Sequence, residues 1–216
     1  GAAYGNGSVS AVYGSQTDPV DLGSGGGAGD NYYGSSYGGD GAGAVRMIVG
    51  GTLAVNGAIT ADGDAGYQRP TYDARGGGSG GSIYVDTNAL TGTGVITALG
   101  GPGGGTYGGA GGGGRIAIYY GSSTFDLSSM SAAGGDGYRD GDGGTVYTRQ
   151  EGQPAQVLIT EDAAWTAGTH DYTGSNIVVA EGATLTCEAS TGDGTGTVIL
   201  CENLTVETGG HLSADG

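Results

Sequence analysis

Apolar residues recur along this 216-residue chain in short alternating runs that are separated by glycine. Four of these runs share a glycine followed by alternating polar and apolar positions, and they begin at Gly43, Gly81, Gly114 and Gly144. Alternation with a period of two predicts β-strands, here of about three to six residues each. No stretch has the 3.6-residue period of an amphipathic helix, so the pattern predicts an all-β chain.

A second motif interleaves with these runs. It reads Ile-Thr-Ala-Asp-Gly from Ile59, and related five-residue copies begin at Ile96, Met130 and Leu212. Two motifs that alternate along a chain indicate an array of similar units, and such arrays stack into solenoids. We therefore predict that these four apolar residues occupy equivalent inward positions.

The length of the glycine runs between strand units divides the chain into two sections. In residues 1–148 the strand units are separated by glycine-rich excursions of variable length, which we expect to emerge as loops from one face of the solenoid. In residues 149–216 the glycine runs shorten, and residues 176–186 and 203–214 read as two successive rungs. We expect the second section to continue the first.

Glycine supplies 54 residues, about a quarter of the chain. It does not recur at every third position, which excludes collagen, and a phosphate-binding loop would need a lysine that the chain lacks. Extended polyglycine strands can instead lie side by side where no side chain intervenes. Tyrosines punctuate these runs and are expected to cover them: Tyr32, Tyr33, Tyr37, Tyr67, Tyr72 and Tyr107.

The pattern of residues 53–63, Leu-x-Val-x-Gly-x-Ile-Thr-Ala-x-Gly, and the run Gly-Gly-Gly-Gly-Arg-Ile-Ala-Ile-Tyr-Tyr at 111–120 carry a resemblance. They resemble the glycine-rich repeat region of large bacterial surface and secreted proteins. The likeness covers residues 23–148 and, more loosely, 176–216. It implies a right-handed parallel β-helix with long polyglycine II-like loops. The glycine runs are also similar in composition to the glycine-rich domain of anaplastic lymphoma kinase-type receptors, where polyglycine helices bundle.

The charge is strongly acidic, with 22 acidic residues against 6 arginines and a net charge of −16. Phosphate contacts need basic side chains, so nucleic acid is not an expected partner. An anionic membrane surface would repel the chain, and no apolar stretch approaches the roughly 20 residues of a membrane span. We expect an extracellular or cell-surface protein that does not insert into membranes.

Candidate metal ligands lie in one acidic turn. Asp136, Asp140 and Asp142 alternate with glycine in a segment that resembles a calcium-binding turn. The segment departs from the secreted nonapeptide repeat and lacks the distal glutamate of an EF-hand. Calcium is therefore the one cofactor hypothesis, and simple solvated turns are the alternative.

The sequence predicts no catalytic residues. His170 and Asp171 lie near Trp165 in the sequence, but they have no partner at the spacing of a metal site or a triad. Asp73 and Arg75 form one pair of the kind that carbohydrate-cleaving β-helices use, which is thin support for an enzyme. The two cysteines, Cys187 and Cys201, are interpreted either as a disulfide or as free thiols in neighbouring strands.

Together these features predict a structural protein: a repeat unit of a filament, stalk or surface scaffold. A carbohydrate- or calcium-binding adhesin module is the alternative hypothesis, and a polysaccharide-active β-helix enzyme is the third. The motif that ends at Gly216 is followed, in its internal copies, by a glycine-rich excursion like the one that begins at Gly1, as if one unit had been cut from a longer array. We therefore expect the last rung, Leu204 to Ala214, to stack on another copy and give head-to-tail association.

Overall fold

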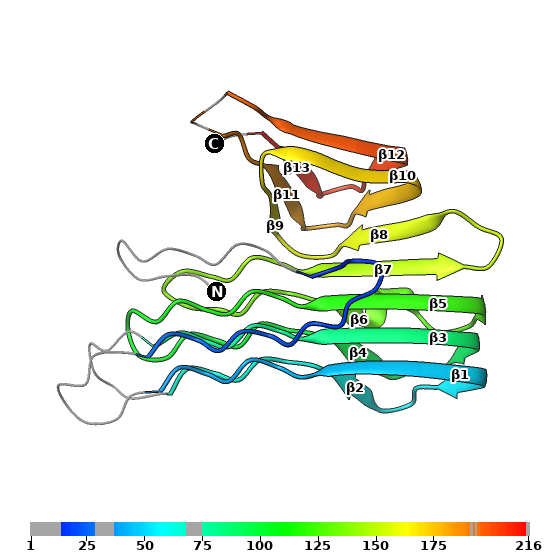
Figure 1. Ribbon diagram of the computed structural model, residues 1–216, viewed down its shortest axis with the longest axis horizontal. Coiled ribbons are helices and arrows are strands. Elements are labelled where there is room, and N and C mark those ends of the chain that lie inside the picture. The colour runs from blue at the N-terminus through cyan, green and yellow to red at the C-terminus, as the bar shows by residue number, and fades with distance from the viewer. Residues whose placement is uncertain (1–13, 29–36, 68–74, 191, 193, 215–216) are drawn as a thin grey trace.

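The regular secondary structure of the described residues is almost all β-strand. A computed structural model describes residues 14–28, 37–67, 75–190, 192 and 194–214. Three sheets form in this part of the chain: a seven-stranded sheet of order β1-β3-β5-β7-β8-β10-β12, and two three-stranded sheets of order β2-β4-β6 and β13-β11-β9 (Figure 1). This confirms the all-β prediction.

The first half of the molecule, residues 14–150, alternates a long strand of the main sheet with a short strand of the second sheet. Its elements are β1 (Ala44–Ala54), β2 (Ala58–Thr60), β3 (Ser82–Thr91), β4 (Val95–Thr97), β5 (Arg115–Ser123), a short 3-10 helix (Leu127–Ser129), β6 (Met130–Ser131) and β7 (Thr145–Gln150). All neighbouring strands of this half are parallel.

The second half, residues 155–214, repeats the alternation with shorter connections. Its strands are β8 (Ala155–Ile159), β9 (Ala163–Trp165), β10 (Gly168–Val179), β11 (Thr184–Cys187), β12 (Thr197–Val206) and β13 (His211–Ser213). They too pair in parallel with one another. However, β8 pairs with β7 in the antiparallel direction, so the shared sheet is mixed and the chain reverses between the halves. The sequence did not predict this reversal.

The register follows the sequence repeats closely. Ile59 pairs with Ile96, and Ile96 pairs with Met130, as the five-residue motif predicted. Leu212 also faces inward from a short strand, but it lies in the other small sheet, where it pairs with Leu185 and is 45% exposed, so it does not belong to the same stack. The two predicted rungs of the second half are confirmed, since residues 176–179 pair with 203–206 and 184–186 with 211–213.

The described residues form two hydrophobic cores, and these lie on opposite faces of the shared sheet. Val146 belongs to the first core, and its partner Leu158 packs against that core. The next pair, Tyr147 and Val157, belongs to the second core. Paired residues place their side chains on the same face, and successive residues alternate between faces. The antiparallel junction therefore moves the interior from one side of the sheet to the other.

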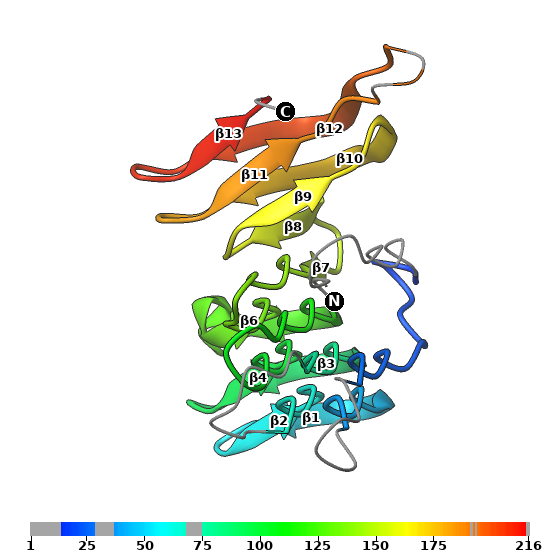
Figure 2. The same cartoon turned by 90° about the vertical axis from the view of Figure 1, so that its left-hand side faces the viewer.

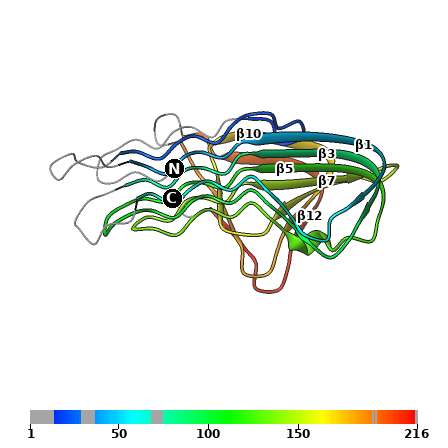
Figure 3. The same ribbon diagram turned by 90° about the horizontal axis from the view of Figure 1, so that it is seen from below.

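Glycine-rich segments extend the strands of the first half toward one end of the molecule (Figures 1 and 3). We call them the glycine bundle; they are residues 23–27, 38–43, 61–66, 76–81, 98–104, 108–114, 132–136 and 141–144. Figure 2 looks along them and shows them gathered beside one another.

The central segment of the bundle, residues 76–81, donates hydrogen bonds to three neighbours in strict rotation. The N–H groups of Gly76, Gly77 and Gly78 donate to the carbonyls of Gly27, Gly109 and Asp64, each at 2.9 Å. The next three N–H groups repeat the same order of neighbouring segments. A three-residue period with bonds to different neighbours is the geometry of packed polyproline II-type strands.

At most positions of this segment the packing leaves no space for a side chain. A Cβ added to Gly77 would lie 1.9 Å from the carbonyl oxygen of Gly101, and one added to Gly81 would lie 1.8 Å from that of Gly43. Real Cβ atoms essentially never approach backbone atoms so closely. In the described residues, the glycine runs therefore lie side by side as closely packed extended segments.

Candidate functional site

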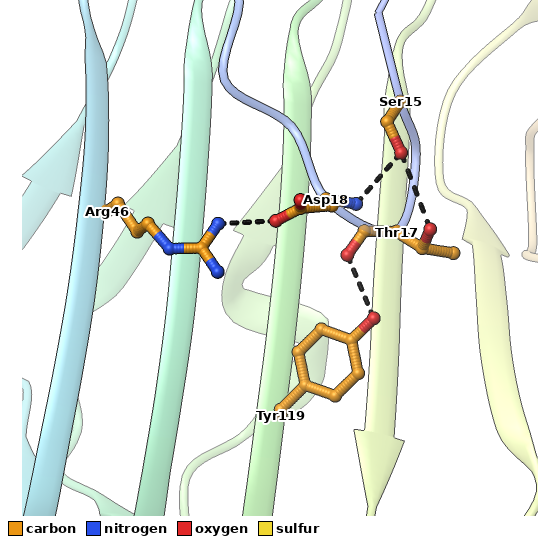
Figure 4. A network of polar contacts seen from close by, with 5 residues as sticks. All are labelled: Ser15, Thr17, Asp18, Arg46 and Tyr119. Carbon is orange, nitrogen blue, oxygen red and sulfur yellow. Dashed lines mark hydrogen bonds and ion pairs between the residues drawn. The ribbon is translucent and has the colours of Figure 1, made fainter.

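A polar network ties the N-terminal segment to the outer face of the main sheet. We call residues 14–22 the strap. The carboxylate of Asp18 accepts from the guanidinium of Arg46, and the Tyr119 hydroxyl donates to the Thr17 carbonyl at 2.8 Å (Figure 4). Ser15 steadies the turn by accepting from the Asp18 N–H at 2.9 Å. The strap therefore contacts strands β1 and β5 at once.

The same face carries a row of tyrosines beneath the strap. Tyr119 lies between Tyr84 and Tyr147, with ring centroids 5.5 and 5.7 Å away. The guanidinium of Arg46 stacks 3.8 Å above the Tyr84 ring. Burial raises the pKa of Tyr119, because its phenolate would lose hydration, and so this hydroxyl stays protonated. The row is a packed surface of aromatic rings.

A second aromatic cluster closes the core of the second half. Trp165 is buried and stacks on His170 at 4.8 Å and on Tyr172 at 5.3 Å. Desolvation raises the pKa of Tyr172 to about 12. The Tyr172 hydroxyl donates to the side-chain oxygen of Gln16, so the strap also contacts the second half.

Of the His170–Asp171–Trp165 trio, the structure brings His170 and Trp165 together and leaves Asp171 apart. His170 joins the aromatic stack, and its Nε2 lies 2.9 Å from the Thr166 carbonyl. Asp171 is exposed on the other face of the strand, where its carboxylate accepts from the hydroxyl of Thr173 at 2.7 Å. That hydrogen bond holds the pKa of Asp171 below its usual value. These contacts describe a packed ring and a local turn.

The three predicted metal ligands are exposed and serve the turn in which they lie. The carboxylate of Asp140 accepts from the Gly137 N–H at 2.9 Å. The main-chain carbonyls of Asp136 and Asp142 accept from the glycine bundle, at 2.8 and 2.9 Å. Within the described residues, no group of three His, Cys, Asp or Glu side chains is placed to hold a metal ion. Calcium binding at Asp136, Asp140 and Asp142 stays a prediction.

Two other aspartates, Asp62 and Asp162, accept hydrogen bonds from a neighbouring rung, a role that the sequence did not predict. Asp62 accepts from the Leu99 N–H at 2.7 Å and from the Thr97 hydroxyl at 3.0 Å, both in the next rung. Asp162 accepts from the Thr184 N–H at 2.7 Å in the same way. Each carboxylate thus joins two rungs beside a short strand. The signal available in the sequence was the aspartate at the fourth position of the Ile-Thr-Ala-Asp-Gly motif.

Arg75 is buried inside the glycine bundle. Only 1% of it is exposed, its Nη1 donates to the Tyr67 carbonyl at 2.9 Å, and its guanidinium lies 5.1 Å from the Tyr67 ring. Its predicted companion Asp73 lies outside the described residues, as do Tyr32, Tyr33 and Tyr72. A buried arginine of this kind braces the bundle. It is not on the surface that a polysaccharide would reach.

Exposed tyrosines gather at the free ends of the glycine bundle. Tyr37, Tyr67 and Tyr138 are 69%, 51% and 57% exposed. The Tyr67 N–H donates to the Tyr37 carbonyl at 3.3 Å, and Tyr138 contacts Tyr107 edge-on at 5.3 Å. Tyrosines at these ends therefore form neighbouring pairs with one or both rings accessible to solvent.

Apolar residues are also exposed at the edge of the second half. Leu204 and Val206 of β12 pair with the buried Ile177 and Val179, so they face the interior, yet they are 40% and 41% exposed. Leu212 of β13 is in the same position above Leu185. Cys187 and Cys201 are not bonded to each other.

Comparison of the chain with protein-family models, curated proteins and solved structures finds no match. The described residues contain no helix with the length and apolar character needed to cross a membrane.

Proposed function

We propose that this chain is an extracellular structural protein, a unit of a filament, stalk or surface scaffold that assembles head to tail. Each half would be a right-handed parallel β-helix, the first with polyglycine II-type loops. Support comes from how the residues are used: the large buried side chains stack rung upon rung, and the glycine segments stack along the same direction. Such an array extends along one axis and suits a load-bearing role.

The open rung of β12 and β13 is the observation that carries the assembly. The inward side chains Leu204, Val206 and Leu212 are each at least 40% exposed, whereas their partners one rung below are fully buried. A further rung placed on this edge would bury them, at about 25 cal/mol for each Å² of apolar surface covered. An edge strand also offers unpaired N–H and C=O groups for pairing.

The opposite edge of the main sheet offers a matching strand. Among the described strands, β1 pairs only with β3, and Ile48 on its outer face is 72% exposed. The strands β1 and β12 run in opposite directions, because the chain reverses at β7 and β8. A β12 strand placed on the β1 strand of the next copy would thus pair in the antiparallel sense, as β8 does with β7.

Head-to-tail assembly can be tested with one charged substitution at this edge. Leu204→Asp places a carboxylate where the next rung would bury it, and we expect association to weaken at least about tenfold. Val198→Asp is the matched control, because Val198 lies on the same strand, is 48% exposed and faces away from the core. Sedimentation velocity over a concentration series, with electron microscopy of the particles, measures the effect. A monodisperse monomer at the highest concentration would contradict the proposal.

A second candidate function is glycan binding at the free ends of the glycine bundle, as in an adhesin module. The exposed rings of Tyr37, Tyr67 and Tyr138 favour it, since aromatic faces combine apolar contact with a polar hydroxyl. Glycan-array binding that is saturable and that is lost in Tyr67→Ala, but kept in Leu204→Asp, would support this function. An array without retained glycans would contradict it.

A further inference from the structure

Two tyrosines at the free end of the glycine bundle have their rings in contact. Tyr107 follows residues 98–104 and Tyr138 follows residues 132–136, so each lies in the turn that joins two segments of the bundle. Their ring centroids are 5.3 Å apart, and the planes of the rings meet at 73°. This edge-to-face contact places edge carbon atoms of one ring against the other ring. A small rotation of either side chain would therefore bring two edge carbon atoms together.

The backbone holds the two turns together. The N–H of Tyr138 donates to the carbonyl of Gly108, the residue after Tyr107, at 2.9 Å. The N–H of Ala110 donates to the carbonyl of Arg139, the residue after Tyr138, also at 2.9 Å. Both bonds cross between the segment of one tyrosine and the segment of the other. The two rings are thus positioned beside each other by the fold, and joining them needs no large movement of the chain.

Exposure to solvent separates this pair from the row of tyrosines beneath the strap. Tyr138 is 57% exposed and Tyr107 is half-buried. In the row, Tyr84 and Tyr147 contact Tyr119 at similar ring distances, but they are only 9% and 5% exposed. Burial also raises the pKa of Tyr119, so loss of its phenolic proton is disfavoured. An oxidant in solution would therefore react with the pair at the end of the bundle before it reacts with the row.

We propose that Tyr107 and Tyr138 form a site of oxidative modification, at which their rings are coupled into a dityrosine cross-link. The oxidant would be hydrogen peroxide acting through a peroxidase. Each tyrosine gives up one electron and its phenolic proton, and the two phenoxyl radicals join through a bond between carbon atoms ortho to the hydroxyls. Each of these carbons then passes its hydrogen to the phenolic oxygen as a proton, which restores the aromatic rings. The two electrons and two protons that leave the pair reduce one molecule of hydrogen peroxide to two molecules of water.

The cross-link would fasten the free end of the bundle. It joins the turns of two neighbouring rungs, which otherwise are held there by hydrogen bonds between backbone groups. A covalent bond between residues distant in the sequence also restricts the unfolded chain, which favours the folded state. Because the bond lies within one chain, the proposal goes beyond the proposed function and does not depend on head-to-tail assembly.

The test treats the full chain, at low concentration, with a peroxidase and hydrogen peroxide. The monomer band of a denaturing gel is then digested with trypsin, which cleaves after arginine and so places Tyr107 in peptide 76–115 and Tyr138 in peptide 116–139. We expect the fluorescence of dityrosine in this band. Mass spectrometry should detect the two peptides joined to each other, with the loss of two hydrogen atoms.

Single substitutions identify the pair that reacts, because both peptides also carry tyrosines of the buried row. Tyr107→Phe and Tyr138→Phe should each abolish the joined peptides, since phenylalanine keeps the ring contact but cannot form a phenoxyl radical. Tyr84→Phe is the matched control: it lies in the same peptide as Tyr107 but is buried, and it should leave the joined peptides unchanged. Joined peptides that persist in Tyr138→Phe, an equal loss in Tyr84→Phe, or no joined peptides in the monomer band would overturn the proposal.

Discussion

The two halves of the molecule use glycine for different physical reasons. In the glycine bundle, the closely packed residues such as Gly77, Gly78 and Gly81 have no positive φ, and an added Cβ would collide with a neighbouring backbone. In the second half, Gly168, Gly174 and Gly182 have φ of 132°, 78° and 80°, and an added Cβ would meet nothing within 4 Å. The glycines of the bundle are needed because a side chain would not fit, and these three glycines of the second half are needed because their backbone is left-handed.

This difference explains the shape of each half. Segments without side chains approach one another closely enough for backbone groups to bond in three directions, so long glycine runs become ordered structure. A single glycine at a corner only lets the chain turn, and the rungs of the second half are accordingly compact. The same residue type therefore builds an extended bundle in one half and short corners in the other.

The largest expected effect is a collision in the bundle. Gly78→Ala would place a Cβ 1.9 Å from the carbonyl oxygen of Asp40, in a segment with neighbours on several sides. We expect the free energy of unfolding to fall by about 3 kcal/mol, measured by chemical denaturation. Gly43→Ala is the control: an added Cβ there meets nothing within 4 Å, so stability should hold or rise slightly. Equal losses in the two variants would refute the role of close packing.

A smaller effect is expected where only the backbone conformation demands glycine. Gly182→Ala should lower the free energy of unfolding by about 1 kcal/mol, because alanine resists a φ of 80° even with open space around it. Gly196→Ala, at an open position without positive φ, should change it by less than about 0.5 kcal/mol. If Gly182→Ala proved as costly as Gly78→Ala, the distinction between the halves would fail.

The burial of the Tyr172 hydroxyl predicts a pH dependence, because desolvation raises the pKa of this group. Tyr172 has a pKa of about 12 when folded, above its ordinary value near 10. The folded state then holds the proton more tightly, so this contribution to stability is complete below pH 10 and is lost as pH rises toward 12. Denaturation curves across this range should show a smaller decline in Tyr172→Phe. Denaturation at pH 7 measures the stability lost with the hydrogen bond to Gln16 alone. If stability falls as steeply with rising pH in Tyr172→Phe as in the native protein, Tyr172 is not the titrating group.

The smallest effect is expected at the ion pair of the strap with the first half. Asp18→Asn removes the charge that faces Arg46, while both side chains are well exposed, 61% and 44%. Water and salt screen such a pair strongly, so we expect no measurable change in melting temperature at low or high salt. A salt-dependent loss of several degrees would instead show that this end of the strap holds the fold.

Much of the strand arrangement could be predicted from the residues. The alternation around Ile83, Ile116 and Val146 predicted strands, and these residues indeed pair in register across the main sheet. The repeated motif likewise predicted the stack of Ile59, Ile96 and Met130. The motif did not show that Leu212 lies in a separate stack, because a five-residue motif fits any short parallel strand. The contacts of Asp62 and Asp162 were missed because their partners lie 22 to 37 residues away.

The sequence by itself determined the local elements. A two-residue alternation buries one face of each strand. The glycine runs lack the lysine of a phosphate-binding loop and the period of a helix, so extended packing is the ordered structure that they favour. Only the tertiary structure decided where those elements meet. The reversal between β7 and β8 moves the core from one face of the sheet to the other, and it depends on which strand edge Ala155–Ile159 reaches. The three-way bonding of the glycine bundle also depends on neighbours distant in the sequence. Local propensity describes what a segment can form, whereas partner choice depends on contacts that exist only once the chain has folded.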